Sequence, residues 1–210
     1  MKNQRILILG PHTDDGEWGA GASIARWIRQ GNQVWYAAFS AAEESVLSEF
    51  SPDVLRTEIV NASAELGILN ENLRVFHYKV RYFPRDRQDL LEEMIRLRLE
   101  IEPTLVVLPS SYDTHQDHKI ISEEGFRAFK RSSILGYEIP WNNRKIDLTF
   151  FQEVGEDDLA SKVRAIAAYK SQVFRNPQYE EFIRSLAVQR GFQVGCRYSE
   201  AYEVIRWVAH

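Results

Sequence analysis

The sequence has little of several features that mark particular classes of protein. A single cysteine, Cys196, excludes an intrachain disulfide framework and indicates a reducing compartment. No hydrophobic run is long enough to span a bilayer, and the apolar stretch from Ile6 to Leu9 is too short for a signal peptide. Positive charge is not in excess, because the formal net charge is -4, which disfavours nucleic acid and anionic membranes as partners. We therefore expect a cytoplasmic protein without a membrane span.

The pattern that is present is an alternation of strands and helices. Short apolar runs that fit buried strands lie at 6–9, 34–39, 73–78 and 104–108, and a helical pattern follows each of them. The 210 residues are 44% hydrophobic, which suffices for a sizeable core, and they contain no internal repeat or linker. We predict a single domain over 1–210 of the α/β class, with a three-layer Rossmann-like architecture in which helices flank a mostly parallel sheet.

The limits of the other elements follow from capping and breaking residues. The second helix is expected to begin with Ser51 as its N-cap and Pro52 at its first helical position, and to end at Gly67. The remaining helices and strands are expected at 16–30, 86–101, 115–130, 134–139, 145–154, 156–171, 177–189 and 199–208.

Polar side chains follow the first and fourth predicted strands, at the point where each strand ends. Gly10 and Pro11 stop the first strand, and His12, Asp14 and Asp15 come directly after them. His115 and His118 follow the strand at 104–108 in the same way. The carboxyl ends of parallel strands share one edge of the sheet, where ligands bind. We expect these two groups to lie at that edge.

The residue types in these two groups fit a metal site. Two histidines and a carboxylate with an open position form the ligand set of a catalytic zinc, and they also suit other divalent metals such as iron. Histidines and aspartates at such positions also serve as helix caps, and Asp14 or Asp15 fits the cap of the first helix. The glycines at 19 and 21 do not complete a dinucleotide fingerprint, so a dinucleotide site is not expected.

Beyond spacing, the motifs resemble those of a known family. Residues 10–24, GPHTDDGEWGAGASI, resemble the HPDD-x-E-x-G-x-G-G opening of the PIG-L/LmbE-like zinc de-N-acetylases, and HQDH at 115–118 resembles their HxDH motif. Three later segments are similar to the LR-x-E…LG helix, the K-x-x-A…SQ helix and the closing RG…AEAF segment of that family. Their matching residues are Leu55, Arg56, Glu58, Ala62, Leu66 and Gly67; Lys162, Ala165, Ile166, Tyr169, Ser171 and Gln172; and Arg190, Gly191 and residues 199–202. Thr13 stands where the family has Pro, and Gly16 stands where many members have Glu or Ile.

Carried over position by position, the resemblance implies a metal centre with a catalytic base. It makes His12, Asp15 and His118 the ligands of a Zn²⁺ ion, with Fe²⁺ as an alternative. It leaves Asp14 as the carboxylate that takes a proton from a metal-activated water. His115 matches the histidine that faces the tetrahedral intermediate, and as an imidazolium it would stabilise the oxyanion.

The resemblance also suggests roles around the reacting atoms. Asp117 would orient His115, although a plain helix cap explains Asp117 equally well. Arg56 would contact sugar hydroxyls or a phosphate, and Trp141, in a polar loop, would stack on a sugar ring. Trp18 could line the acyl pocket, but its helical spacing favours the core.

These features predict a metal-dependent hydrolase that removes the acetyl group from an N-acetylated amino sugar or its conjugate. The alternatives are hydrolysis of another amide and a non-catalytic metal-containing binding protein. A Rossmann-like nucleotide-binding domain without metal is a third, and it requires the side chains of His12 and His118 to lie more than about 6 Å apart, given metal–ligand bonds of about 2 Å. The aromatic residues near the C-terminus fit a core or a homo-oligomer interface equally well.

Overall fold

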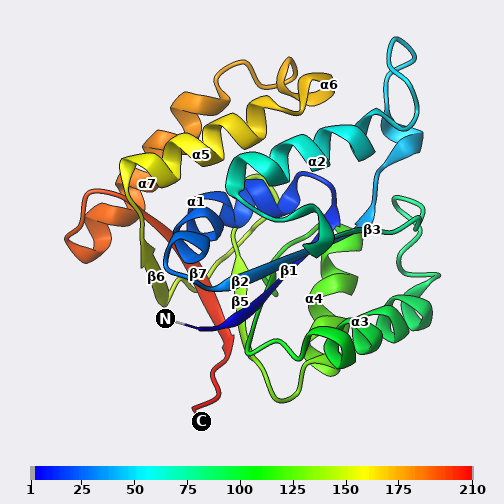
Figure 1. The fold of residues 1–210 in the computed structure, drawn as a ribbon, viewed down its shortest axis with the longest axis horizontal. Coiled ribbons are helices and arrows are strands. Elements are labelled where there is room, and N and C mark those ends of the chain that lie inside the picture. The colour runs from blue at the N-terminus through cyan, green and yellow to red at the C-terminus, as the bar shows by residue number, and fades with distance from the viewer. Residues whose placement is uncertain (1–2, 210) are drawn as a thin grey trace.

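A sheet forms the middle layer of the structure, a computed structural model that describes residues 3–209 (Figure 1). Within these residues it has seven strands in the order β3-β2-β1-β4-β5-β7-β6. The first five run parallel, and β7 pairs antiparallel with both β5 and β6. The strands are β1 (Arg5–His12), β2 (Gln33–Ser40), β3 (Leu73–Val75), β4 (Leu105–Pro109), β5 (Ser133–Tyr137), β6 (Phe150–Glu153) and β7 (Ser199–Arg206). The predicted fold class is confirmed.

Helices cover both faces of the sheet. One face carries α1 (Asp15–Arg29), α2 (Val54–Leu66) and α5 (Glu156–Ala167), with the short α6 (Lys170–Val173) and α7 (Tyr179–Val194) beside them. The other face carries α3 (Arg87–Ile101) and α4 (Gln116–Ala128), which pack against each other. Within the described part of the chain, every helix is too short or too polar to cross a bilayer.

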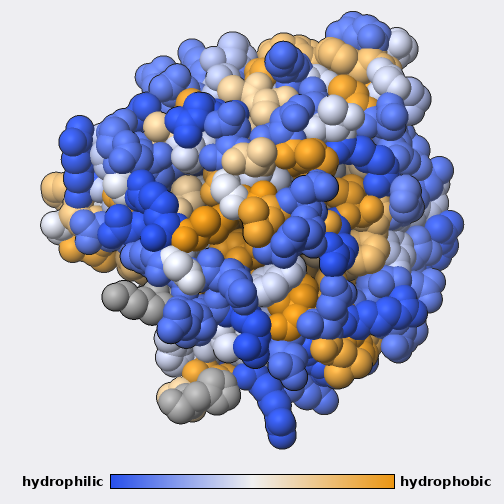
Figure 2. Space-filling model, viewed as in Figure 1, coloured by the Kyte–Doolittle hydropathy of each residue, from blue (hydrophilic) through white to orange (hydrophobic). Residues whose placement is uncertain are grey.

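The apolar run of β1 shows why the sheet needs two helical layers. Successive side chains of a strand point to opposite faces. Ile6 and Ile8 accordingly enter the core that includes α1, α2 and α5, whereas Leu7 and Leu9 enter the core that includes α3 and α4. All four side chains are fully buried. Figure 2 shows hydrophobic side chains near the centre of the same view and hydrophilic ones around its rim.

The strand order creates a crevice at the carboxyl edge. From β1 the chain moves to β2 and β3 on one side, and it then returns to place β4 on the other side of β1. Ligands of open α/β sheets bind where the order reverses in this way, between the carboxyl ends of the two central strands. Here these strands are β1 and β4, the two after which the predicted site residues follow.

Several element limits differ from those expected. Asp53, and not Ser51, is the N-cap of α2, because residues 51–54 form a turn closed by a hydrogen bond from the Val54 N–H to the Ser51 carbonyl oxygen. β3 stops at Val75, and β6 starts only at Phe150. The helix expected at 156–171 is divided into α5 and α6 at Tyr169, whose side chain turns into the core.

The glycines at 19 and 21 serve close packing of α1. A Cβ atom at Gly19 would overlap the ring of Tyr137 and lie 2.8 Å from its Cβ atom, and one at Gly21 would lie 2.8 Å from Cγ of Lys162. Tyr137 is fully buried and donates a hydrogen bond to the Leu9 carbonyl oxygen, so its ring has no room to move.

Gly19→Ala is therefore expected to lower the free energy of unfolding by about 1–3 kcal/mol, the usual cost of overpacking a core. Urea unfolding measures this change. Gly155→Ala is the matched control, because its Cβ atom would find its nearest neighbour at an ordinary 3.5 Å. Equal effects of the two substitutions would contradict the packing explanation.

Candidate metal centre and active site

Two chain segments meet at the crevice between β1 and β4. β1 ends at His12, and α1 begins at Asp15 three residues later. His115 is the N-cap of α4, which follows β4 and carries His118 in its first turn. Since β1 and β4 are neighbouring parallel strands, both segments emerge at the same edge. The predicted convergence of the two groups is found.

Asp15 lies at the centre of this cluster. One of its oxygens, Oδ2, accepts a hydrogen bond of 2.8 Å from the His12 backbone N–H, which fixes the carboxylate. The same oxygen lies 3.1 Å from His12 Nδ1 and 3.3 Å from His118 Nε2. The ring centroids of the two histidines are 5.3 Å apart, within the limit that separates shared ligation from a domain without metal.

The spacing of these three atoms fits a divalent cation. Tetrahedral zinc, with bonds of about 2.0–2.1 Å, holds its ligand atoms roughly 3.3 Å apart. The group of His12, Asp15 and His118 matches this value for its two nitrogen–oxygen pairs, and all its ligand atoms lie within 4.8 Å of one another. His12, His115 and Asp117 form a second group within the same limit.

Hydrogen bonds on the outer side of the rings favour the first group. His12 Nε2 donates to Oδ2 of Asp117 over 3.1 Å, which leaves Nδ1 directed at Asp15. Asp117 is fully buried and also accepts from the Arg81 N–H. The expected pairing of Asp117 with His115 is thus wrong for its carboxylate, which orients His12; only its backbone N–H contacts the His115 ring, at Nδ1.

Asp113 orients the second histidine in the same way. Its Oδ2 atom lies 2.8 Å from His118 Nδ1, so Nε2 of that ring faces the cluster. The other oxygen of Asp113 accepts from the His115 N–H. Partners of this kind fix the tautomer and orientation of a metal-binding ring. Asp113 is not among the residues predicted from the sequence, although an aspartate five residues before a candidate ligand is a usable signal.

Asp113→Ala should weaken metal binding by about 10- to 100-fold, the usual effect of losing the hydrogen-bond partner of a ligating histidine. Competition with a chromophoric chelator measures the affinity. Asp157→Ala is the control, because its carboxylate is 91% exposed and far from the histidines in the sequence. An unchanged affinity in Asp113→Ala would contradict the assignment of His118 as a ligand.

The carboxylates of the cluster raise the pKa values of its two buried histidines. Burial lowers the pKa of His12, but its hydrogen bonds to Asp117 and Asp15 outweigh burial and raise this pKa to about 9. Burial of His118 is likewise outweighed, chiefly by the charge of Asp15 and the hydrogen bond to Asp113, and its pKa rises to about 10. Both rings are therefore protonated at neutral pH without a metal, and a metal must displace these protons to bind.

Asp14 differs from its neighbour in environment. It occupies the N-cap position of α1 but makes no capping hydrogen bond with its side chain. Burial, followed by the negative charge of Asp15, raises the pKa of Asp14 to about 6. The interactions of Asp15 with His118 and His12 outweigh its burial and hold its pKa well below the usual range. Adjacent carboxylates with opposite shifts are typical of a site that divides acid–base and ligand roles.

His115 is held in one orientation. Its Nδ1 atom accepts from the Asp117 N–H over 3.2 Å, so the remaining nitrogen, Nε2, carries the proton. Burial, with the neighbouring rings of His118 and His12, lowers the pKa of His115. In this orientation a neutral His115 ring can donate one hydrogen bond through Nε2–H, and the imidazolium expected from the sequence stays a prediction.

A cavity of about 290 Å³ opens beside these groups, large enough for a small ligand. Its lining includes the candidate ligands His12, Asp15 and His118 together with Asp14 and His115. The other lining residues are Trp18, Trp141, Asn142, Ile166, Tyr169, Gln172, Val173, Arg175 and Asn176.

Comparison with known protein families matches the part of the chain that carries this site. The family described as "GlcNAc-PI de-N-acetylase", PIG-L, matches residues 7–129, which is more than half of the chain. The chain belongs to the PIG-L family. The matched region contains every residue of the candidate metal centre, and the resemblance inferred from the motifs is confirmed.

Relatives of known name share the fold at low identity. A diacetylchitobiose deacetylase of Thermococcus kodakarensis is 23% identical and aligns with 96% of this chain and 83% of its own. The conserved protein TT1542 of Thermus thermophilus superposes with a TM-score of 0.80, at 22% identity over 99% of this chain and 97% of its own. GalB of Pseudomonas putida, a 4-carboxy-2-hydroxymuconate hydratase, superposes with a TM-score of 0.78, at 20% identity over 100% of this chain and 98% of its own. The fold is thus shared by proteins named for different reactions.

Glu17, a residue of the PIG-L motif, takes part in a buried hydrogen-bond network at the turn between β1 and α1. The hydroxyls of Tyr36 and Tyr169 each lie within hydrogen-bond distance of the Thr13 carbonyl oxygen and of the Glu17 carboxyl group. Glu17 is fully buried, and burial raises its pKa to about 8, so it is protonated at pH 7 and can supply a third hydrogen to these contacts. Thr13 accepts these hydrogen bonds through its backbone carbonyl oxygen, which a proline also has. Threonine can therefore stand where the family has proline.

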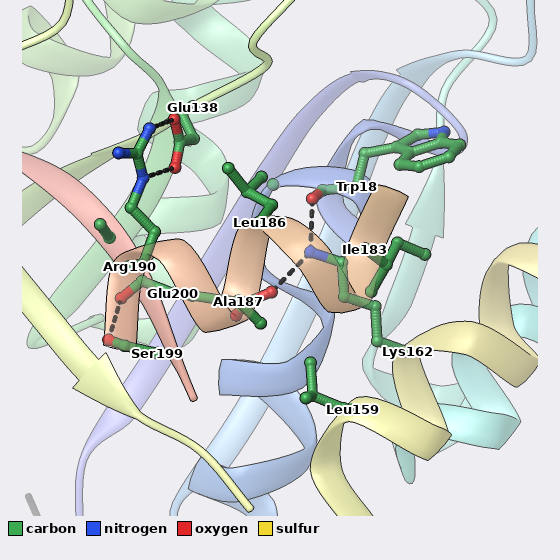
Figure 3. Close-up of a pocket in the computed structure, with 12 residues that line it drawn as sticks. Trp18, Glu138, Leu159, Lys162, Ile183, Leu186, Ala187, Arg190, Ser199 and Glu200 are labelled. Atoms are coloured by element: carbon green, nitrogen blue, oxygen red, sulfur yellow. Dashed lines mark hydrogen bonds and ion pairs between the residues drawn. The ribbon is translucent and has the colours of Figure 1, made fainter. Parts of the chain in front are cut away.

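Another pair of PIG-L motif residues anchors α1 to the sheet. Lys162 Nζ donates to the Trp18 carbonyl oxygen and to Oε1 of Glu200, both over 2.6 Å (Figure 3). Glu200 also accepts from the backbone N–H groups of Ala22 and Ser23. Figure 3 shows the Trp18 indole pointing away from this buried ion pair. The ion pair therefore fixes the backbone of α1, while the side chain of Trp18 lines the cavity.

Of the two predicted substrate-binding residues of this PIG-L protein, Trp141 lines the cavity and Arg56 does not. Trp141 lines the cavity and is 58% exposed, as a stacking surface requires. Arg56 lies outside the cavity lining; its guanidinium donates to the carbonyl oxygens of Val75 and Phe76 and pairs with Glu43 at 2.8 Å. Trp18, expected in the core, packs against core residues and also lines the cavity.

Proposed function

We propose that this PIG-L family protein is a metal-dependent hydrolase that removes the acetyl group from an N-acetylated amino sugar or its conjugate. The observation that carries the proposal is the common orientation of His12, Asp15 and His118 with Asp14 toward one cavity. Two histidines and a carboxylate are the protein ligand set of a catalytic zinc, and the carboxylate of Asp14 lines the same cavity. The products are acetate and a free amine.

The metal would be zinc by the composition of the ligand set, with ferrous iron as an alternative. When bound, it polarises the acetyl carbonyl and makes a water more acidic. Asp14 takes the proton of the attacking water as its oxygen bonds to the carbonyl carbon. When the carbon–nitrogen bond breaks, Asp14 returns that proton to the departing amine. His115 donates its Nε2–H to the oxygen on which negative charge develops.

The cavity wall supports an amino sugar as the substrate. Trp141 presents an aromatic surface, and Asn142 and Gln172 present amide groups suited to sugar hydroxyls. The relative from Thermococcus is named for an N-acetylated sugar. Arg56, occupied by Glu43 and by two carbonyl oxygens, takes a structural role here. The single domain over 1–210, the cytoplasmic location and a homo-oligomer stay predictions of the sequence.

The rate should depend on pH through Asp14. A general base must be ionised, so kcat/KM is expected to fall tenfold per unit on the acid side, with an apparent pKa at or below about 6. A bound cation stabilises the carboxylate and shifts this value downward. Initial rates from pH 4.5 to 9 measure the profile. An acid limb centred above 8, with metal content constant, would exclude Asp14 as the base.

Acetate release tests the proposal most simply. Proton NMR of the zinc-loaded protein with N-acetylglucosamine glycosides should show free acetate and a glucosamine glycoside in equal amounts. Other N-acylated amines test the amidase alternative, and an unsaturated dicarboxylic acid tests water addition, the reaction for which GalB is named. Tight sugar binding without acetate would instead indicate a binding protein of the same fold.

A further inference from the structure

A second cavity lies at the opposite edge of the sheet from the candidate active site. Its volume is about 610 Å³, and it opens where the amino ends of β1, β4 and β5 meet the carboxyl ends of α3 and α4. Arg5, at the start of β1, lines this cavity, whereas His12 ends the same strand at the metal centre. Seven residues of strand place the Cα atoms of these two residues about 23 Å apart, at about 3.3 Å per residue. The cavity is therefore separate from the site described above.

Four of the side chains that line the second cavity are cations. They are Arg5, Arg98, Lys130 and Arg131, and Glu102 is the one carboxylate among the described residues of the lining. Four cations against one carboxylate give a local charge of +3, in a chain whose net charge is -4. We call this space the basic cavity. A concave surface with one sign of charge raises the local concentration of ligands of the opposite sign.

Helix capping explains only part of this cluster. Cations stabilise the carboxyl end of a helix by binding its last carbonyl oxygens. At the end of α4, Arg98 and Arg206 already donate hydrogen bonds to the carbonyl oxygens of three residues, Phe126, Ala128 and Phe129. Lys130 and Arg131 are exposed, and their side chains make no hydrogen bond or ion pair with the described residues. Capping therefore leaves these two cations without a role.

The backbone holds the two arginines of the basic cavity in place. Arg5 Nε donates to the Glu102 carbonyl oxygen over 2.9 Å, and Arg98 Nη1 donates to the Ala128 carbonyl oxygen over 2.7 Å. A guanidinium has five N–H donors, so each arginine keeps donors for a ligand. Arg5 also lies 3.7 Å from the Glu102 carboxylate, but the two side chains are 43% and 78% exposed. An ion pair as exposed as this is weak, and a more highly charged anion can displace it.

We propose that the basic cavity binds the diphosphate group of a small molecule. Guanidinium groups match phosphate oxygens with paired N–H donors, and the Lys130 ammonium adds a compact positive charge. A diphosphate carries several negative charges, so it matches the surplus of cations better than a single carboxylate does. The source is either inorganic pyrophosphate or a nucleoside diphosphate whose base contacts Leu99, which is 69% exposed in the lining. This binding site does not depend on the proposed deacetylase function.

Isothermal titration calorimetry with pyrophosphate, ADP, inorganic phosphate and citrate tests the proposal. Pyrophosphate or ADP should bind with a Kd below about 1 mM at physiological ionic strength, and phosphate should bind at least about tenfold more weakly. Tighter binding of ADP than of pyrophosphate identifies a nucleotide as the ligand, and equal binding identifies the diphosphate group alone. Phosphate or citrate bound as tightly as pyrophosphate would show mere charge neutralisation and overturn the proposal.

Substitutions in the lining locate the binding site. Lys130→Gln and Arg131→Gln should each weaken pyrophosphate binding by about tenfold, the effect of losing one charge-assisted hydrogen bond. Glu102→Gln should strengthen binding by about threefold, because it removes the carboxylate that competes for Arg5. Arg197→Gln is the matched control, since Arg197 is exposed and lines neither this cavity nor the one at the metal centre. Equal affinities in all these proteins would overturn the proposal.

A comparison with and without metal separates the basic cavity from the metal centre. Phosphate groups also bind divalent metals, so the titration is made on zinc-loaded protein and on protein freed of metal by dialysis against a chelator. The Kd for pyrophosphate should be the same in both, because the cavity lies at the other edge of the sheet. Binding that requires zinc and is unaffected by Arg131→Gln would assign pyrophosphate to the metal centre and overturn the proposal.

Discussion

Asp14→Asn is expected to lower kcat by about 10²–10⁴-fold while leaving the metal content unchanged, since this is the usual contribution of a positioned general base. The amide keeps the size of the side chain but cannot accept a proton at neutral pH. Asp14 lines the cavity without a capping hydrogen bond, so the substitution removes no side-chain cap from α1. Steady-state rates and atomic absorption on the same sample measure both quantities.

Asp53→Asn is the matched control for this substitution. Asp53 is also an N-cap aspartate whose side chain makes no capping hydrogen bond, but it begins α2 and lies outside the cavity lining. The kcat of Asp53→Asn should equal that of the wild type. Full activity of Asp14→Asn would show that another group moves the proton, and loss of metal from it would make Asp14 a ligand.

His118→Ala should abolish metal binding and activity together. The loss of affinity should exceed the 10- to 100-fold expected for Asp113→Ala, because a ligand is removed and not only its partner. His118 is 2% exposed and is paired with the fully buried carboxylate of Asp113. Its removal leaves that charge without its partner, so stability should also fall, by about 3–5 kcal/mol.

Folding and metal binding are separated by a second variant and a control. His118→Gln retains a polar group near Asp113, so it should fold better than His118→Ala and still fail to bind the metal tightly. His77→Ala removes an exposed histidine that contacts Arg56, and it should keep both metal and activity. A folded His118→Gln protein with wild-type metal affinity would exclude His118 from the ligand set.

The fold was predictable because its signals are local. The uninterrupted run from Ile6 to Leu9 indicates burial on both faces, and the two cores confirm it. The position of the site was predictable for a similar reason, because His12 lies at the end of β1 and His118 follows β4, and these two parallel strands are neighbours in the sheet. The start of α2 was less predictable, because a turn at residues 51–54 decides it. β3 ends at Val75, although the backbone N–H groups of Phe76 and Tyr78 still donate to carbonyl oxygens of β2.

The outer hydrogen bonds of the site were not predictable from spacing. Asp117 lies two residues from His115 in sequence, yet its carboxylate reaches His12 from across the crevice. Its second partner is the backbone N–H of Arg81, which adopts a positive φ of 71°. A main-chain donor in a left-handed conformation leaves no signal in side-chain chemistry. Such strain is typical of segments that support a functional site.

The family motifs far from the metal centre have structural explanations that the sequence left open. Lys162 and Glu200 form the ion pair that anchors α1, and Glu58 accepts two hydrogen bonds from Ser171. Both pairs join segments more than thirty residues apart, as the numbering shows. Their side chains are buried, so the motif residues at these positions maintain the packing of the helices over the cavity.

We expect one metal ion at His12, Asp15 and His118 to support hydrolysis of an N-acetyl group. Metal-free protein is titrated with zinc while acetate release from a phenyl N-acetylglucosaminide is followed. The rate should rise linearly and reach a plateau at one equivalent per chain, and a chelator should reverse it. Acetate release that is independent of metal, or no release at saturating zinc or ferrous iron from any N-acetylated sugar glycoside, would contradict the claim.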